Sequence, residues 1–291
     1  MKLEYVVNTL TKYEDVKQVL KYEFLISDRL TKKLKNAKQI YLNNKQTNIN
    51  HKLEIGSLIT VQLDFNETCE NIVPKKMKLD ILYEDEALLI LNKPPFMPVH
   101  PSMDHFTDSI SNGVKHYFNS IGLKRKIRPV NRLDKNTSGI VIFAKNEYIQ
   151  ECLVKQMKSG DLKKEYLALV DGIINKKEQI VNAPIARKRN SIIERCIHSS
   201  GDKAITIIQL LKVFDTYSLI KCILKTGRTH QIRVHTKYIG NPILGDDLYG
   251  GKTDKINRQA LHAYRISFIH PINKKNIEIQ TKIPKDIGDL I

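Results

Sequence analysis

Asp134 is the first residue whose surroundings suggest chemistry. It lies in the segment Arg128–Gly139, which is rich in turn-forming residues and is followed at once by the apolar run Ile140–Phe143. This pattern predicts a loop beside a buried strand, with the Asp134 carboxylate on the loop and Arg132 two residues away. Because Asp is itself a common turn-former, an ordinary surface turn explains this segment better when it is taken alone.

A second polar cluster begins with Gly227, which is expected to permit a sharp turn after a strand. Thr229 is expected to cap a helix that extends to Tyr238. His230 and Arg233 are three positions apart, so they share one face of that helix. Such a cluster is costly to bury without partners and would suit a site where a buried Arg meets a carboxylate, although an exposed polar helix start fits equally well.

Tyr166 is the third candidate. It opens the apolar segment Tyr166–Val170, directly after Lys164-Glu165. A tyrosine ring in this position could stack on a nucleobase. Taken alone, it is better explained as a core residue, because aromatic side chains are common in half-buried strands.

The elements that must position these residues are many short strands and a few helices. The predicted strands are Leu3–Val7, Ile40–Leu42, Leu58–Leu63, Ile81–Tyr83, Ala87–Leu91, Ile140–Phe143, Tyr166–Val170, Ala204–Leu211, Tyr217–Leu224, Arg265–Ile269 and Ile277–Ile283. The predicted helices are Glu14–Phe24, a second one from Asp28, Thr107–Phe118, Glu147–Lys158 and Thr229–Tyr238. Short loops between many strands predict an α+β fold, with a largely antiparallel mixed sheet and flanking helices.

The chain is expected to contain two domains. Residues 1–75 form a small α/β unit, and Pro74–Lys78 is a linker to the larger part, residues 76–291. In the small unit, Ser27 is expected to cap a lysine-rich helix. A basic helix suits RNA binding, although a solvated face on an ordinary helix explains it equally well.

The charge of the chain limits the kinds of partner that it is expected to bind. Its 291 residues include 48 Lys or Arg and 31 Asp or Glu, a formal net charge of +17, which indicates a nucleic acid or an anionic membrane surface. No apolar run approaches the ~20 residues of a spanning helix, and the N-terminus has no signal-peptide core. Four scattered cysteines show no zinc-like spacing and suggest reduced thiols. A cytoplasmic protein without membrane contact is therefore expected.

Together, the motifs of residues 80–291 resemble the RluA-type family of RNA pseudouridine synthases. The matching segments, in chain order, are Tyr83–Glu86, Asn92–Pro95, Val99–Pro101, Arg128–Gly139, Lys164–Tyr166, Gly201–Thr206, Gly227–His235, Gly240–Asp246 and Leu261–Ala263. The family usually has His before Arg-Leu-Asp, whereas this chain has Asn131, which can form hydrogen bonds but cannot be charged.

The resemblance implies a role for each candidate. Asp134 would be the catalytic nucleophile, Arg233 would pair with it, and Tyr166 would stack on the extracted base. A neighbouring guanidinium favours the ionised form of a buried carboxylate. Arg132 would help hold the RNA strand after the uridine is flipped out of its helix.

A further set of residues is expected to contact RNA, largely through its phosphates. This set consists of Arg128, Lys164, Arg187, Arg189, Arg228 and His230. Two basic runs, Lys124–Arg128 and Arg187–Arg195, are expected to face the backbone, although a merely solvated surface would give the same pattern.

Residues 1–75 resemble the ribosomal-protein-S-four-like module that precedes the catalytic domain in many pseudouridine synthases. The match lies in Ser27–Leu30, Ile40–Asn43 and Leu53–Val61, and a glycine usual in that module is missing from Ala37–Gln39. This module favours large-subunit ribosomal RNA as the substrate. Transfer RNA stays open as an alternative, and the sequence does not specify which uridine is modified.

The reaction that the resemblance implies is an isomerisation that needs no cofactor or metal. A non-catalytic RNA-binding or ribosome-assembly protein is the alternative function. A glycosidase with paired carboxylates fits poorly, because no second acid accompanies Asp134 in any motif. Asp246 and Asp247 lack a third ligand at a spacing that suits a metal. A monomer is expected.

Overall fold

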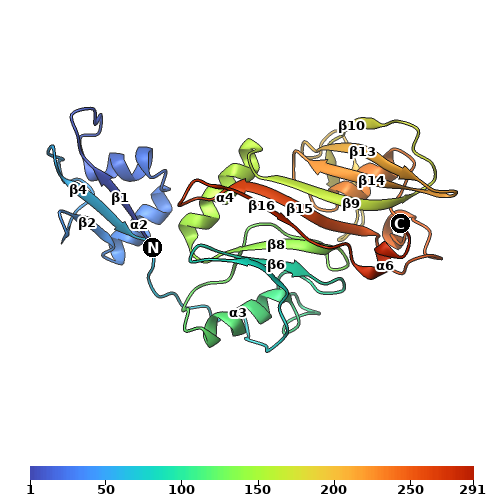
Figure 1. Ribbon diagram of the computed structural model, residues 1–291, viewed down its shortest axis with the longest axis horizontal. Coiled ribbons are helices and arrows are strands. Elements are labelled where there is room, and N and C mark those ends of the chain that lie inside the picture. Colours follow the sequence, from blue (N-terminus) through green and yellow to red (C-terminus); the bar gives the residue numbers. More distant parts are fainter.

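A computed structural model describes residues 1–291 and contains a small sheet, a large sheet and a separate two-stranded hairpin (Figure 1). The small sheet is antiparallel, in the order β1-β4-β2-β3. Its part of the chain comprises β1 (Lys2–Val6), α1 (Val16–Gln18), the π-helix η1 (Val19–Glu23), α2 (Asp28–Asn36), β2 (Ile40–Leu42), β3 (Lys45–Gln46) and β4 (Leu58–Gln62). Ser27 caps α2 as predicted, because its hydroxyl accepts a hydrogen bond from the Leu30 N–H.

The predicted helix Glu14–Phe24 is wrong in detail, since it is split into α1 and η1. The N–H of Phe24 donates to the carbonyl of Val19, five residues back, so the last turn is wider than an α-helix. Val16 in α1 and Val19 and Leu20 in η1 are completely buried. The two short helices therefore place one apolar face in the core.

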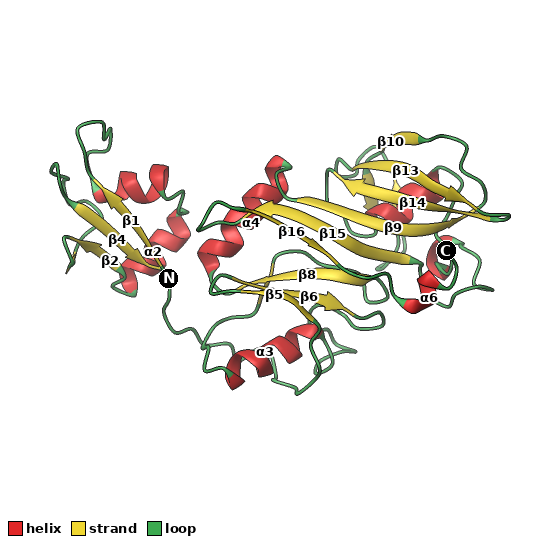
Figure 2. Cartoon of the chain, in the orientation of Figure 1, coloured by secondary structure: helices red, strands yellow, loops and turns green.

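The large sheet has ten strands, and its main path runs β10-β13-β14-β9-β15-β8-β6-β5 (Figure 2). β16 pairs with β15, and β7 pairs with β8. The strands are β5 (Ile81–Glu84), β6 (Leu88–Lys93), β7 (Arg128–Pro129), β8 (Ser138–Ala144), β9 (Lys163–Asp171), β10 (Glu178–Asn182), β13 (Ile205–Val213), β14 (Tyr217–Leu224), β15 (Leu261–Ile269) and β16 (Asn276–Gln280). β11 (Ile185–Arg187) and β12 (Arg195–Ile197) form the hairpin. The predicted α+β fold with a largely antiparallel sheet is confirmed.

The helices of this larger part are few. They are α3 (Ile110–Ser120), α4 (Glu147–Ser159), α5 (Gln231–Tyr238), the 3-10 helix η2 (Asp247–Tyr249) and α6 (Lys285–Gly288). None of the helices is long and apolar enough to cross a membrane. α3 starts three residues later than predicted, because the capping box formed by Ser109 and Asn112 fixes its first turn.

Both faces of the large sheet are buried at β6 and β8, so these two strands are almost continuously apolar. In β6, Leu89 and Leu91 join the core that contains α3, whereas Leu88 and Ile90 join the core that contains α4. The second core also includes the apolar residues of the small sheet. The two parts of the chain therefore share an apolar core on one face of the large sheet.

Polar contacts also connect the N-terminal part to α4. Arg29 and Lys33 on α2 form ion pairs with the buried Glu147 carboxylate. Ser27 donates a 2.7 Å hydrogen bond to Glu151. The basic helix that the sequence assigned to RNA binding therefore directs two of its cations toward the large-sheet part.

One parallel strand pair brings the two halves of the large sheet together. His262 and Ala263 of β15 pair with Ser138 and Gly139 of β8, and every other pair in this sheet is antiparallel. Gly139 has a φ of +115°, and a Cβ there would lie 2.2 Å from the Ala263 carbonyl oxygen. Only glycine fits this close approach, which occurs five residues after Asp134.

Candidate active site

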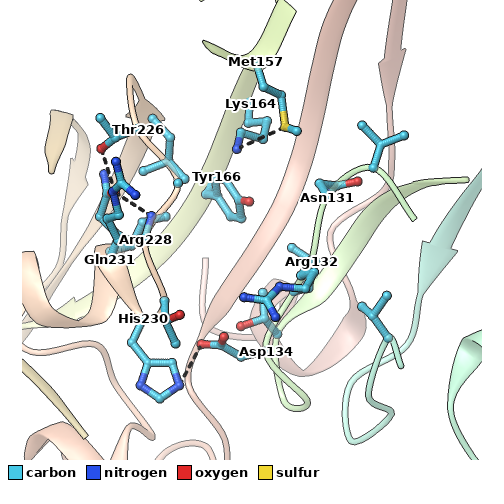
Figure 3. Close-up of a pocket in the computed structure, with 18 of the residues that line it drawn as sticks. Asn131, Arg132, Asp134, Met157, Lys164, Tyr166, Thr226, Arg228, His230 and Gln231 are labelled. Atoms are coloured by element: carbon cyan, nitrogen blue, oxygen red, sulfur yellow. Dashed lines mark hydrogen bonds and ion pairs between the residues drawn. The ribbon is translucent and has the colours of Figure 1, made fainter. Parts of the chain in front are cut away.

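A pocket of about 820 Å³ lies where the Asp134 loop, the C-terminal half of α4, β9 and the start of α5 meet. Figure 3 shows the side chains that line it, with Asp134 opposite Tyr166. Four segments of the chain thus contribute to one pocket. Asp134, Tyr166 and Arg233, which the sequence singled out separately, all line it.

Asp134 and Arg233 form the predicted ion pair. Arg233 Nη1 donates to Asp134 Oδ2 over 3.1 Å, although the two residues are 99 positions apart. The Asp134 side chain is 27% exposed, so one side of the carboxylate is open to the pocket. The carboxylate is thereby oriented by a fixed cation while it stays accessible to a substrate.

Asp246 holds Arg233 in place. Its carboxylate, 0% exposed, accepts hydrogen bonds from Arg233 Nε at 2.7 Å and from Nη2 at 2.8 Å. Burial alone would lower the pKa of Arg233, but the carboxylates of Asp246 and Asp134 raise it above its ordinary value. Because this geometry uses Nε and Nη2, only Nη1 is directed to Asp134.

His230 also faces Asp134, from the residue before α5. Its Nε2 lies 3.8 Å from Asp134 Oδ2, and its Nδ1 lies 2.8 Å from the hydroxyl of Tyr249. That hydroxyl already accepts the backbone N–H of Arg195 at 2.9 Å, so it is placed to donate to Nδ1. Burial lowers the pKa of His230, although Asp134 acts in the opposite direction. A neutral His230 would thus present its Nε2–H toward Asp134.

Buried side chains fix the loop that follows Asp134. Lys93 Nζ donates to the carbonyl of Lys135 at 3.0 Å, and also to the carbonyls of Pro94 and Met97. Burial and the nearby Arg258 lower the pKa of Lys93 to about 7.

Two further side chains hold the same loop from the segment just before β15. Arg258 Nη1 donates to the carbonyl of Asn136 at 3.1 Å, and Gln259 donates to the hydroxyl of Thr137 at 3.2 Å. The loop that carries Asp134 is thereby held by groups from two other segments of the chain.

Tyr166 lies within β9, with its ring at the pocket wall. Its side chain is buried and makes no hydrogen bond to the protein. Burial raises the pKa of its hydroxyl, and the charge of Asp134 raises it further. A neutral, flat ring beside the carboxylate can accept a stacked base.

Lys164 lines the same wall two residues earlier. Burial lowers the pKa of its ammonium group. A Cβ on Gly227 would lie 3.2 Å from Lys164 Nζ, and Gly227 does not have a left-handed backbone. The chain does turn between β14 and α5, where Gly227 lies, and the missing side chain of Gly227 also leaves space for Lys164.

The predicted helix cap at Thr229 is wrong. The N-cap of α5 is His230, whose φ of 56° is left-handed, and the helix begins at Gln231. Gln231 Oε1 accepts the backbone N–H of Arg228 at 3.0 Å and the hydroxyl of Thr226 at 2.7 Å. A side chain within the helix therefore closes the turn, which frees Thr229 to line the pocket.

Asn131 has a structural task. Its Nδ2 donates to the carbonyl of Ile140 at 3.0 Å, and its Oδ1 accepts the N–H of Ile142 at 2.9 Å. The amide thus continues the strand pairing between this loop and β8. Both of its polar atoms take part in this pairing, and an amide side chain has no titratable proton.

The predicted RNA-binding residues divide into two groups. Arg132, Lys164, Arg228 and His230 line the pocket, and Arg187 and Arg189 are exposed. The prediction that Arg128 contacts RNA is wrong. Arg128 is buried and forms a bidentate ion pair with Glu67, with N–O distances of 2.7 and 2.5 Å. It is a structural residue and is not available to a phosphate. The same holds for Arg125, which is buried against Asp64 and Phe65.

Sequence reasoning missed Asp246, Tyr249, Lys93, Arg258 and Gln259 as parts of the site. A signal existed for Lys93, a charged residue at the end of an apolar strand and before two prolines. The carboxylates of the site are engaged by arginine, and no group of three or more His, Cys, Asp or Glu side chains is placed to hold a metal ion.

The known proteins that resemble this chain in sequence and structure are pseudouridine synthases. The sequence profile of the RNA pseudouridylate synthase family matches residues 87–238. A Bacillus subtilis (strain 168) protein named as an uncharacterized RNA pseudouridine synthase, YjbO, is 38% identical over 92% of this chain and 95% of its own. Ribosomal large subunit pseudouridine synthase D of Blochmanniella floridana is 34% identical over 87% of this chain and 86% of its own. The solved structure of human RNA pseudouridylate synthase domain containing 1 covers 70% of this chain and 83% of its own, with a TM-score of 0.58 and 26% identity.

Proposed function

The chain belongs to the RNA pseudouridylate synthase family and is an isomerase, and we propose that it modifies specific uridines of large-subunit ribosomal RNA with Asp134 as the nucleophile. The observation that carries this proposal is the partly exposed Asp134 carboxylate, which faces the pocket and is oriented by Arg233. An aspartate that merely stabilised a turn would not need a buried arginine whose other donors are fixed by a second carboxylate.

In the proposed reaction, the Asp134 carboxylate attacks the uridine at its sugar or its base, and the bond between N1 and C1′ breaks. The uracil turns, a bond forms between C5 and C1′, and the bond that the Asp134 carboxylate made to the uridine breaks, which regenerates the free carboxylate. The C5 proton leaves to solvent, and N1 takes up a proton. Arg233 keeps the carboxylate ionised and oriented, and Tyr166 stacks on the extracted base. Arg132 holds the strand while the uridine is out of its helix.

Ribosomal RNA is proposed as the substrate on two grounds. A relative that matches most of this chain is named for the large ribosomal subunit. The N-terminal part, which we propose to be an RNA-binding module, still presents Lys32 and Lys35 of α2 to solvent. Transfer RNA is the alternative substrate. Mapping pseudouridines across total RNA from cells with and without the gene distinguishes the two.

Asp134→Asn tests the proposed nucleophile. The substitution keeps the shape of the side chain and removes its charge and nucleophilicity, so pseudouridine formation should be abolished. Release of tritium from C5-labelled uridine in RNA measures the reaction. Asp215→Asn is the matched control, because Asp215 is exposed and has no hydrogen-bond or ion-pair partner.

Activity of Asp134→Asn within about tenfold of wild type, a barrier change of only ~1.4 kcal/mol, would exclude Asp134 as the nucleophile. Equal RNA binding by both proteins, together with no tritium release from wild type, would instead support the non-catalytic alternative.

A further inference from the structure

A second hollow, of about 520 Å³, adjoins the active-site pocket. The two share Arg132, Gly227, Arg228 and Thr229 along their border. Figure 3 shows Arg132 and Arg228 among the side chains of the pocket. The rest of the hollow is formed by the β11–β12 hairpin and by the turn Ser200–Asp202.

Four guanidinium groups line this hollow. Arg187 and Arg195 are cross-strand partners in the hairpin, and Arg132 and Arg228 come from the two loops of the active site. The one acidic residue there is Asp202, whose Oδ2 lies 3.3 Å from Arg228 Nη1. Like charges that line one hollow repel one another, so an excess of positive charge without a counter-ion raises the energy of the free protein.

Most arginines of the chain form an ion pair with a carboxylate, but most of those that line the hollow do not. Of eleven arginines, seven have a carboxylate within 4.0 Å: Arg29, Arg125, Arg128, Arg228, Arg233, Arg258 and Arg265. The four without one are Arg132, Arg187, Arg189 and Arg195, and three of these line the same hollow. Outside the hollow, every arginine except Arg189 has a carboxylate partner. The arginines without a carboxylate partner are therefore concentrated in the hollow.

The backbone around the hollow is fixed by close contacts. Gly201 lies directly against β11, and a Cβ there would be 2.4 Å from the carbonyl carbon of Ile185. The Arg195 backbone N–H is bonded to Tyr249, the residue that contacts His230. The arginines of the hairpin are therefore connected to the site where Asp134 lies.

We propose that this hollow binds one backbone phosphate of the RNA, next to the uridine that enters the active-site pocket. The inference rests on the proposed function, since the strand that carries the flipped uridine must run past Arg132. Guanidinium groups bind phosphate oxygens through paired, charge-assisted hydrogen bonds. The phosphate would supply the negative charge that the protein does not, and it would fix how far the uridine advances toward Asp134.

The test uses the hairpin arginines, which do not line the active-site pocket. Arg187→Gln and Arg195→Gln are compared with Arg189→Gln, which removes one equal charge from the same hairpin but lies outside the hollow. Binding of the full chain to an unmodified transcript of large-subunit ribosomal RNA is measured across a range of salt concentrations. Arg187→Lys and Arg195→Lys keep the charge.

Loss of a phosphate contact should reduce the slope of log affinity against log salt by about 0.7 to 0.9 in each hollow variant, and raise Kd about tenfold at roughly 0.1 M salt. Arg189→Gln should change the salt slope and Kd much less. The lysine variants should retain the wild-type slope, because phosphate binding needs the charge. Tritium release in a single turnover at saturating RNA should fall in Arg187→Gln and Arg195→Gln, because the phosphate no longer fixes how far the uridine advances, and should fall less in Arg189→Gln.

Two results would overturn the phosphate site. One is that the hollow variants bind as Arg189→Gln does. The other is that the glutamine variants lose affinity while their salt slope stays at the wild-type value, which would indicate that these arginines contact uncharged groups and not a phosphate. A different result would contradict the proposed function, namely that the wild-type protein releases no tritium. If wild type releases tritium normally but the variants show none of these binding differences, only the phosphate site is contradicted.

Discussion

Asp246 makes no contact with a substrate in the proposed reaction, yet the geometry of Arg233 depends on it. Its carboxylate takes two of the guanidinium donors and leaves Nη1 for Asp134. Asp246→Asn leaves the buried arginine with one charged partner. We expect the free energy of unfolding to fall by roughly 3 kcal/mol. Activity should fall as well, because Nη1 loses its fixed direction.

Chemical denaturation and tritium release measure the two effects of Asp246→Asn. Asp247→Asn is the control, since this neighbour is exposed and its carboxylate accepts only the N–H of Leu248. Equal stability and activity of the two variants would contradict the positioning role of Asp246.

His262 should make the fold sensitive to acid. It is buried, its Nδ1 lies 2.9 Å from the Ser138 hydroxyl, and burial together with Arg258 lowers its pKa to about 4. In the unfolded chain the pKa of histidine is about 6.5, so the unfolded state binds the extra proton first as the pH falls. The stability from neutral His262 is therefore fully present above about pH 6.5 and is lost as the pH falls toward 4.

Between about pH 7 and pH 4, wild type should lose roughly 3 kcal/mol more stability than His262→Gln, whose side chain cannot be protonated. Urea unfolding at several pH values measures this difference. Parallel loss in the two proteins would show that His262 is not the group responsible.

Single residues also mark the limit of sequence reasoning at this site. The pairing of Asp134 with Arg233 could be predicted, because both lie in motifs that resemble one family. Arg128 was misassigned, since a basic residue in a basic run has the same pattern whether it faces solvent or a buried acid. Glu67, its partner, is 61 residues away, and no local pattern reports such a contact.

The approach of β8 to β15 is the feature of the secondary structure on which the Asp134 loop most depends. In Gly139→Ala, the new Cβ would lie 2.2 Å from the Ala263 carbonyl oxygen, at a φ of +115°. We expect a loss of more than about 3 kcal/mol of stability, because neither strand can move without breaking its other pairs. Thermal unfolding measures the change.

Gly122→Ala is the control for this substitution. Gly122 also has a left-handed φ, +71°, but nothing lies within 4 Å of the point that its new Cβ would occupy. It should cost only about 1 kcal/mol. Similar losses in both variants would show that backbone conformation alone, and no steric contact, makes Gly139 necessary.

Strands were easier to predict than turns and short hairpins. The strand Tyr217–Leu224 has the predicted bounds, because a long apolar pattern has few alternatives. β11 and β12 were missed, since three residues each are too few for a pattern. The start of α5 was misplaced because Thr229 is a good capping residue by type, while the actual turn is closed by Gln231, whose role needs the folded backbone.

At the scale of the whole molecule, the segment between the two sheets belongs structurally with the larger one. Cys69 and Ile72 lie in the core that contains α3, and Glu67 pairs with the buried Arg128. Deleting residues 1–75 should therefore destabilise the remainder by roughly 3 kcal/mol more than deleting residues 1–63, because it leaves Arg128 without its bidentate partner. Thermal melting of the two truncated proteins tests this expectation.

The shorter deletion tests the contribution of the N-terminal part to RNA binding, and it also exposes the apolar surface that this part shares with α4. Residues 1–63 carry eleven Lys or Arg and six Asp or Glu, so most of the net charge stays on the larger part. We expect a raised apparent KM, a near-normal single-turnover rate at saturating RNA, and a shallower salt dependence of binding. If the truncated protein bound and modified its RNA as well as the full chain does, the N-terminal part would not be an RNA-binding module.

The position of β15 has a consequence for the order in which the enzyme is made. This strand lies in the middle of the large sheet, between β9 and β8, but it is one of the last strands in the chain (Figure 1). During synthesis, both halves of the sheet emerge before the strand that joins them. Asp134 precedes β8 and Arg233 follows β14, and β15 lies between these two halves of the sheet. The two residues therefore belong to unconnected halves until β15 inserts. A growing chain therefore carries the motifs of Asp134 and Arg233 before it can assemble them, and the pocket can form only after β15 has been synthesised.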